Sequence, residues 1–81
     1  MWYVYILLCE DGSLYTGSSN NPEARFADHK IGKGGRYTRS HKPVKLIYTE
    51  QLESKSAALK RESQIKGWSR ENKIRTLKLS I

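Results

Sequence analysis

The segment WYVYILLCEDGSLYTGS, residues 2–18, carries the strongest secondary-structure signals in the chain. Its first eight residues, Trp2 to Cys9, are aromatic, β-branched or apolar on both alternating faces, which is typical of a central β-strand. Glu10-Asp11-Gly12 suits a three-residue hairpin loop with a left-handed glycine at its third position. We therefore predict a hairpin whose return strand runs from Ser13 to Ser18.

The loop length fixes the register of this hairpin. A three-residue loop pairs Leu7 with Tyr15. In the same register Tyr5 lies opposite Gly17, so Tyr5 and Tyr15 share one sheet face as diagonal neighbours. A two-residue loop would shift the pairing by one residue and turn Tyr15 to the other face.

Helices and a third strand are predicted after the hairpin. Asn21 and Pro22 are typical of a helix start, and this helix is expected to end near Ile31, before Gly32. Its core stripe is predicted to be Ala24, Ala27 and Ile31, with Arg25 and His29 on a different face.

The rest of the chain completes one domain. Gly32 to Pro43 is predicted to be a mobile basic loop and Val44 to Glu50 a third strand. Ser54 and Ser69 can each cap a further helix, the first reaching Lys66; the second has Ile74, Leu77 and Ile81 on its inner face. Residues 1–81 are thus predicted to be one α+β domain, a small antiparallel three-stranded sheet flanked by helices in ββα-β-αα order.

Charge points to a polyanionic partner. Fifteen Lys and Arg against eight Asp and Glu give a formal net charge of +7. Nucleic acid, DNA before RNA, fits this charge better than a membrane does, because no helix pairs a basic face with a broad apolar one. A basic surface that only keeps a small domain soluble is the alternative.

Cys9 is the only cysteine, which excludes an internal disulfide and a cysteine-rich zinc site. The longest apolar run, Val4 to Cys9, is far shorter than the about 20 residues of a membrane helix, and no basic leader precedes it. We expect a cytoplasmic protein with no membrane partner.

Glu62 is the most informative single residue. The apolar face of the second helix is formed by Ala58, Leu59 and Ile65, and Glu62 falls on this face. It is either an edge residue that pairs with Lys66 or a partly buried metal ligand. A hard divalent ion with phosphate substrates needs only one or two carboxylates.

Arg25 and His29 are compatible with phosphate chemistry. A guanidinium can hold phosphoryl oxygens in a bidentate way, and an imidazole near its working pH can move a proton. Taken alone, these two residues fit a solvated helix face, and Tyr5 and Tyr15 fit ordinary strand aromatics.

The ordered set of these residues resembles the GIY-YIG nuclease superfamily. Its two name-giving motifs correspond to Tyr3-Val4-Tyr5 and Tyr15-Thr16-Gly17, and Arg25, His29 and Glu62 follow in the family's order. The segments Gly34-Gly35-Arg36-Tyr37 and Ala58-Leu59-Lys60-Arg61-Glu62 are similar to its small stand-alone bacterial members, of the UPF0213 kind. Tyr3, Val4 and Thr16 depart from the motifs, whereas the side chains that do chemistry remain.

The resemblance implies a metal-dependent endonuclease that hydrolyses phosphodiester bonds, in DNA repair or at particular DNA structures. Glu62 would hold a single Mg²⁺ or Mn²⁺, and Arg25 would stabilise charge on the scissile phosphate. Tyr5, Tyr15, His29 and Tyr37 would position or deprotonate water. Because a free phenol has a pKa near ~10, the choice between Tyr15 and His29 as general base stays open.

Nucleic-acid binding is assigned to the acid-free stretch from Lys30 to Thr49 and to cations further along the chain. The residues are Lys33, Arg36, Arg39, Lys66 and Arg70. One alternative is a nucleic-acid-binding module with weak or no catalytic activity alone; another is a basic RNA-associated structural protein, which gives no reason for Glu62. Superfamily members often cut where a second domain or subunit directs them, so a protein partner that directs substrate choice is compatible with this sequence.

Overall fold

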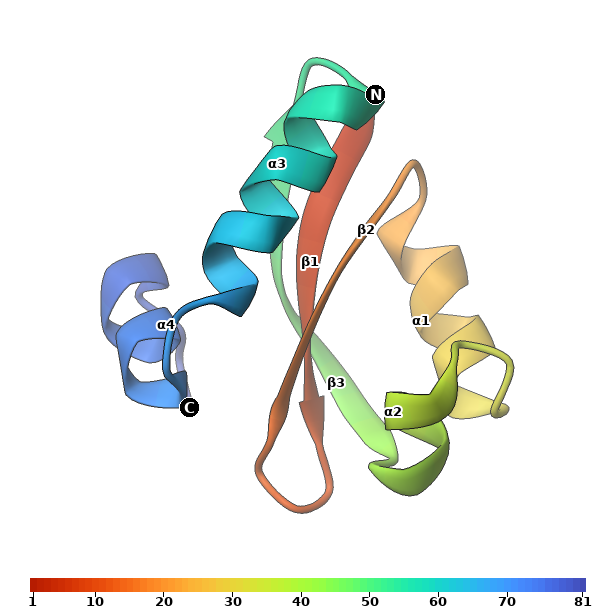
Figure 1. Cartoon of the computed structure of the whole chain (residues 1–81). Helices are drawn as coiled ribbons and strands as arrows, with labels where there is room; N and C mark the ends of the chain where they lie inside the picture. The colour runs from red at the N-terminus through yellow and green to blue at the C-terminus, as the bar shows by residue number, and fades with distance from the viewer.

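A three-stranded antiparallel sheet of order β2-β1-β3 forms the centre of the computed structural model, which describes residues 1–81. The elements are β1 (Trp2–Cys9), β2 (Leu14–Ser19), α1 (Pro22–Lys30), α2 (Arg36–Ser40), β3 (Pro43–Leu52), α3 (Lys55–Lys66) and α4 (Arg70–Leu77). Figure 1 shows α3 and α4 on one side of the sheet and α1 and α2 on the other. The predicted α+β fold is confirmed, and α2 is added to the predicted order.

The hairpin has the predicted loop and register. The Cys9 N–H donates to the Ser13 carbonyl at 2.9 Å, and Gly12 takes a φ of 83° in the left-handed region. Leu7 pairs with Tyr15, and Tyr5 pairs with Gly17. The strands differ from the prediction only at their ends, since β2 begins at Leu14 and β3 extends to Leu52.

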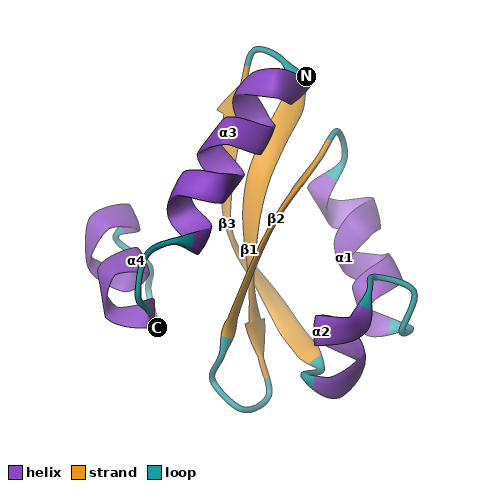
Figure 2. Ribbon diagram, in the orientation of Figure 1, coloured by secondary structure: helices purple, strands orange, loops and turns teal.

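Both faces of β1 are covered by helices (Figure 2), which explains its continuous apolar sequence. On one face Val4 and Ile6 pack with Ala58 and Ile65 of α3 in the main core. The opposite face carries Tyr5, which contacts α1. The sheet therefore separates an apolar core from an aromatic and polar layer.

The predicted helix starts are confirmed by cap hydrogen bonds. Asn21 Oδ1 accepts from the Ala24 N–H at 3.2 Å, and Ser54 and Ser69 accept equivalent bonds at the starts of α3 and α4. The inner face of α4 was predicted correctly for Ile74 and Leu77 and wrongly for Ile81, which is exposed. Leu79 is buried instead, because Lys78 turns the chain with a φ of 54° and brings the Leu79 N–H to the Ile74 carbonyl.

The predicted core stripe of α1 is wrong. Ala24 and Ala27 are exposed, and Ile31 is 68% exposed. The helix instead turns Pro22 and His29 inward. Alanines offer little apolar area to bury, whereas His29 finds hydrogen-bond partners on β1 and α2 that compensate for its burial.

The segment predicted to be a mobile loop contains the short helix α2. Gly35 precedes this helix, and its C-terminal end is closed by the His41 N–H, which donates to the Tyr37 carbonyl at 2.8 Å. Thr38 is the buried residue of this helix. None of the four helices has the length and apolar composition that crossing a membrane requires.

Candidate active site

Tyr5 and Tyr15 lie on the same face of the sheet, as their register predicts. Their ring centroids are 6.3 Å apart. Gly17 makes room for both rings, because a Cβ added there would lie 2.6 Å from Tyr5 Oη and 3.1 Å from Tyr15 Cε2. Any larger residue at this position of β2 would displace the two phenols.

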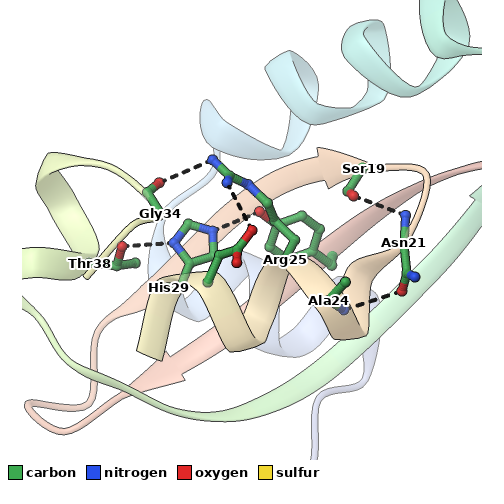
Figure 3. Close-up of polar contacts among 9 residues, drawn as sticks. Ser19, Asn21, Ala24, Arg25, His29, Gly34 and Thr38 are labelled. Carbon is green, nitrogen blue, oxygen red and sulfur yellow. Dashed lines mark hydrogen bonds and ion pairs between the residues drawn. The ribbon is translucent and has the colours of Figure 1, made fainter. Parts of the chain in front are cut away.

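His29 joins three elements through its ring nitrogens. Its side chain comes from α1 and the residue is 1% exposed. Nε2 lies 2.9 Å from the Tyr5 hydroxyl, and Nδ1 lies 2.7 Å from the Thr38 hydroxyl (Figure 3). Gly34 packs directly over the ring, since a Cβ there would lie 1.8 Å from Nδ1.

The electrostatic environment separates the proton affinities of the two hydrogen-bonded groups. Burial lowers the pKa of His29, and the neighbouring Arg25 lowers it further, against the opposing charge of Asp28. Burial also raises the pKa of Tyr5, with Tyr15 and Glu62 adding to the rise and Arg25 opposing it. At neutral pH the imidazole is therefore uncharged and the Tyr5 hydroxyl keeps its proton.

Arg25 holds its guanidinium beside these groups with only weak partners. Nη2 donates to the Gly34 carbonyl at 3.4 Å, and Nη1 lies 3.7 Å from the Asp28 carboxylate (Figure 3). The side chain is partly exposed. A guanidinium carries five N–H donors, so most of those of Arg25 stay free for an incoming anion.

Glu62 contacts β2 from the opposite face of the sheet, at Ser18, the residue after Gly17. Its side chain is 15% exposed, and one carboxylate oxygen accepts from the Ser18 hydroxyl at 2.6 Å. The other lies 2.7 Å from Lys66 Nζ, so the pairing considered from the sequence is present. Glu62 does not lie on the sheet face that carries the tyrosines, because α3 packs on the core side of the sheet. Its charge nevertheless contributes to the raised pKa of Tyr5, after burial and Tyr15.

The donor set around Glu62 fits one hydrated divalent ion. No three His, Cys, Asp or Glu side chains lie close enough together to hold a metal ion. Mg²⁺ is commonly held by one or two carboxylates and keeps several waters and substrate oxygens. Glu62 offers such a carboxylate, and the half-exposed Lys66 side chain is free to leave it.

The remaining sequence-predicted residues lie in two regions. Tyr37 is near the site, with its ring 5.7 Å from that of Tyr15. Lys33, Arg36 and Arg39 are exposed on and before α2. Lys66 and Arg70 lie on the other side of the sheet, where Arg70 Nε donates to the Gly12 carbonyl at 2.8 Å. The structure therefore does not gather the five predicted cations into one patch.

Sequence reasoning missed several partners of the site. Thr38 lies in a helix that was not predicted, so nothing marked it as the partner of His29. Lys73 is buried on α4 and donates to the Thr16 hydroxyl at 3.1 Å. Burial lowers its pKa, and the charge of Lys66 lowers it further. Its spacing of four residues from the inward Leu77 was the available signal.

Comparisons with known proteins match nearly the whole chain. Residues 1–75 match the family model of the GIY-YIG catalytic domain. A UPF0213 protein of Staphylococcus haemolyticus is 51% identical over 75 residues, which cover 93% of this chain and 92% of that protein. One from Natronomonas pharaonis is 52% identical over 73 residues, covering 90% and 86%.

Two solution NMR structures are similar in fold. The UPF0213 protein of Bacillus halodurans has a TM-score of 0.60 at 40% identity, with 96% of this chain and 84% of that chain covered. A protein of E. faecalis has a TM-score of 0.63 at 40% identity, with 94% and 81% covered. The resemblance stated from the sequence is confirmed by these matches.

Proposed function

This chain belongs to the GIY-YIG family, whose superfamily is one of nucleases, and we propose that it is a divalent-metal-dependent endonuclease that hydrolyses phosphodiester bonds in DNA. The observation that carries the proposal is that four chemically suited groups lie on the two sides of the sheet near Gly17 and Ser18 of β2. A linked hydroxyl and imidazole lie on one side with the partly free Arg25 guanidinium. The Glu62 carboxylate lies on the other.

The Tyr5–His29 pair is suited to take a proton from attacking water. We assign the tautomer in which His29 Nδ1–H donates to Thr38, because Nε2 is then free to accept from the Tyr5 hydroxyl. Tyr5 can pass its proton to Nε2 while it accepts the proton of water. His29 is the proton acceptor in this scheme, and the Tyr15 ring lies beside both groups, with its centroid 6.3 Å from that of Tyr5 and 4.8 Å from that of His29.

The second requirement of phosphoryl transfer is positive charge beside the phosphate, to stabilise the negative charge on its oxygens. Arg25 can donate two parallel hydrogen bonds to non-bridging oxygens, as its weakly held guanidinium allows. Mg²⁺ or Mn²⁺ held by Glu62 would stabilise charge on the phosphate oxygens. Lys66, displaced from Glu62, would remain close enough to contact the DNA backbone.

The biological setting belongs to the same proposal. We infer action in the cytoplasm, where a lone reduced thiol such as that of Cys9 is ordinary. DNA repair, or cleavage directed to a DNA structure by a protein partner, suits a nuclease domain of this size. A nucleic-acid-binding module without activity of its own is the second candidate, favoured by the Lys66 ion pair that occupies Glu62.

The deciding experiment compares Glu62→Gln with the wild type. Labelled single-stranded, duplex, flapped and branched DNA, with RNA controls, are incubated in Mg²⁺, Mn²⁺ or EDTA. We expect Glu62→Gln to abolish cleavage and to keep DNA affinity within about threefold, because the ion serves chemistry and the cations serve binding.

Glu53→Gln is the matched control, since Glu53 is exposed and has no partner near the site. It should cleave like the wild type. Equal turnover by Glu62→Gln would remove Glu62 from the chemistry. A wild type that binds DNA and cleaves none of these substrates would favour the binding module.

A further inference from the structure

We propose that Tyr37 and His41 form a stacking platform for an unpaired nucleobase, so that the substrate is single-stranded or locally unpaired beside the scissile phosphate. The inference rests on the proposed function, because it places the bound strand at the same site. It adds a recognition surface and a substrate class to the chemistry of Arg25 and Glu62.

A series of aromatic rings runs from the interior of the site to its surface. Tyr5 is buried, and its ring lies 6.3 Å from that of Tyr15. The ring centroids of Tyr15 and Tyr37 are 5.7 Å apart. Those of Tyr37 and His41 are 4.3 Å apart, and their ring planes make an angle of 26°. Tyr37 and the His41 side chain are each 38% exposed. A base stacked on the platform would continue this series outward.

The platform is held in place before any ligand binds. His41 Nδ1 lies 2.7 Å from one oxygen of Asp11, and the other oxygen of Asp11 accepts from the Ser13 hydroxyl at 2.6 Å. The His41 N–H also donates to the Tyr37 carbonyl. Rings fixed in this way lose little conformational entropy on binding, which favours affinity.

Cations surround the platform and can follow a phosphate backbone. A recess of about 230 Å³ is lined by His41 of the platform and by Glu10, Asp11, Arg39, Ser40 and Lys42. Neither Arg39 nor Lys42 has an ion-pair partner. Exposed rings beside free cations are the combination that binds single strands, because a duplex hides the faces of its bases.

The alternative for Tyr37 is a chemical role for its hydroxyl, as the family resemblance implies. Stacking needs the ring and not the hydroxyl, so Tyr37→Phe and Tyr37→Leu separate the two roles. Tyr3→Leu is the control, because it removes a half-buried tyrosine ring from β1 and not from the platform.

The test measures binding by fluorescence anisotropy in EDTA, where the proposed cleavage does not occur. The probes are a labelled twelve-residue oligothymidine, the same oligomer with abasic sites, and a duplex of equal length. We expect Tyr37→Leu to weaken oligothymidine binding about 5- to 150-fold, the range that corresponds to the loss of one stacked base. Its affinity for the abasic oligomer and the duplex should stay within twofold, and Tyr37→Phe and Tyr3→Leu should bind all three probes like the wild type.

The platform proposal is overturned if Tyr37→Leu binds oligothymidine as tightly as the wild type does. It is also overturned if the variant loses as much affinity for the abasic oligomer as for oligothymidine. If Tyr37→Leu does not fold, the wild-type ring resonances of Tyr37 and His41 are followed by NMR during the same titrations. Shifts caused by oligothymidine and not by the abasic oligomer support stacking, and their absence overturns it. Failure of the nuclease proposal would appear separately, as a wild type that binds these oligomers and never cleaves.

Discussion

His29 is the residue whose protonation most affects the site, because both of its ring nitrogens are engaged and it is almost fully buried. Its pKa is lowered in the folded protein, first by burial and then by Arg25. The unfolded chain therefore takes up a proton at a higher pH than the folded protein does. This difference links the free energy of unfolding to pH.

The sign of that link gives a testable outcome. The contribution of neutral His29 is fully present above its unfolded pKa of about 6.5 and is lost as the pH falls through the lower folded value. Denaturant unfolding between pH 8 and 5.5 should show wild-type stability falling at the acid end. His29→Gln should lack this part of the fall and His41→Gln should keep it; parallel profiles for wild type and His29→Gln would contradict the assignment.

The single residues also show what sequence alone could predict about the site. Glu62 was identifiable because a carboxylate on an apolar helix face is out of pattern, and its side chain is partly buried and paired with Lys66. Thr38 was not, because its role depends on α2 and on the position of α1. A contact that forms only when distant segments pack together cannot be predicted from the spacing of residues in the sequence.

At the scale of elements, the contact between α1 and the segment before α2 is unusually close. Gly34 lies so near the His29 ring that an added methyl group would overlap it. The glycine therefore lets α2 bring Thr38 to His29, and any side chain there must push the two segments apart.

Gly34→Ala tests this contact. We expect a loss of about 1–3 kcal/mol in the free energy of unfolding, which is typical of overpacking, and a strong reduction in cleavage as the Tyr5–His29 bond is broken. Gly67→Ala is the matched control, because its added methyl group would make only an ordinary contact 3.4 Å from Gln64 O. Guanidinium unfolding of the two variants gives the comparison, and equal stabilities would show that the loop shifts without cost.

Elements were predictable where their signals are local. The caps at Asn21, Ser54 and Ser69 and the left-handed Gly12 each involve residues within a few positions of one another. The inward face of α1 was mispredicted because it depends on what the sheet offers. There, hydrogen-bond partners for His29 outweighed the small apolar area of the alanines.

At the scale of the whole molecule, the net charge of +7 governs association with a polyanion. Its distribution decides which cations release counterions when nucleic acid binds. The prediction from sequence places the backbone contacts on Lys33, Arg36 and Arg39, together with Lys66 and Arg70, and the first three are exposed on and before α2.

Neutralising these three residues to Gln should flatten the salt dependence of binding. Each lost phosphate contact lowers the slope of log affinity against log salt by about 0.7 for a single strand, so the triple variant should lose roughly 2. The control neutralises Lys60, Arg75 and Lys78, exposed cations outside the stretch from Lys30 to Thr49. An equal change in both triple variants, measured by salt titration, would assign binding to net charge alone.

The central place of β1 has a consequence during synthesis of the chain. Of the three strands of the sheet, β1 leaves the ribosome first, yet the core residues that cover it include Ala58, Ile65 and Leu79. The seventy residues from the end of β1 at Cys9 to Leu79 (79 − 9) take roughly 4–14 s at 5–20 residues per second. Through that interval the nascent hairpin of β1 and β2 exposes one apolar face. These strands are therefore exposed to the solvent for longer during synthesis than any other part of the core.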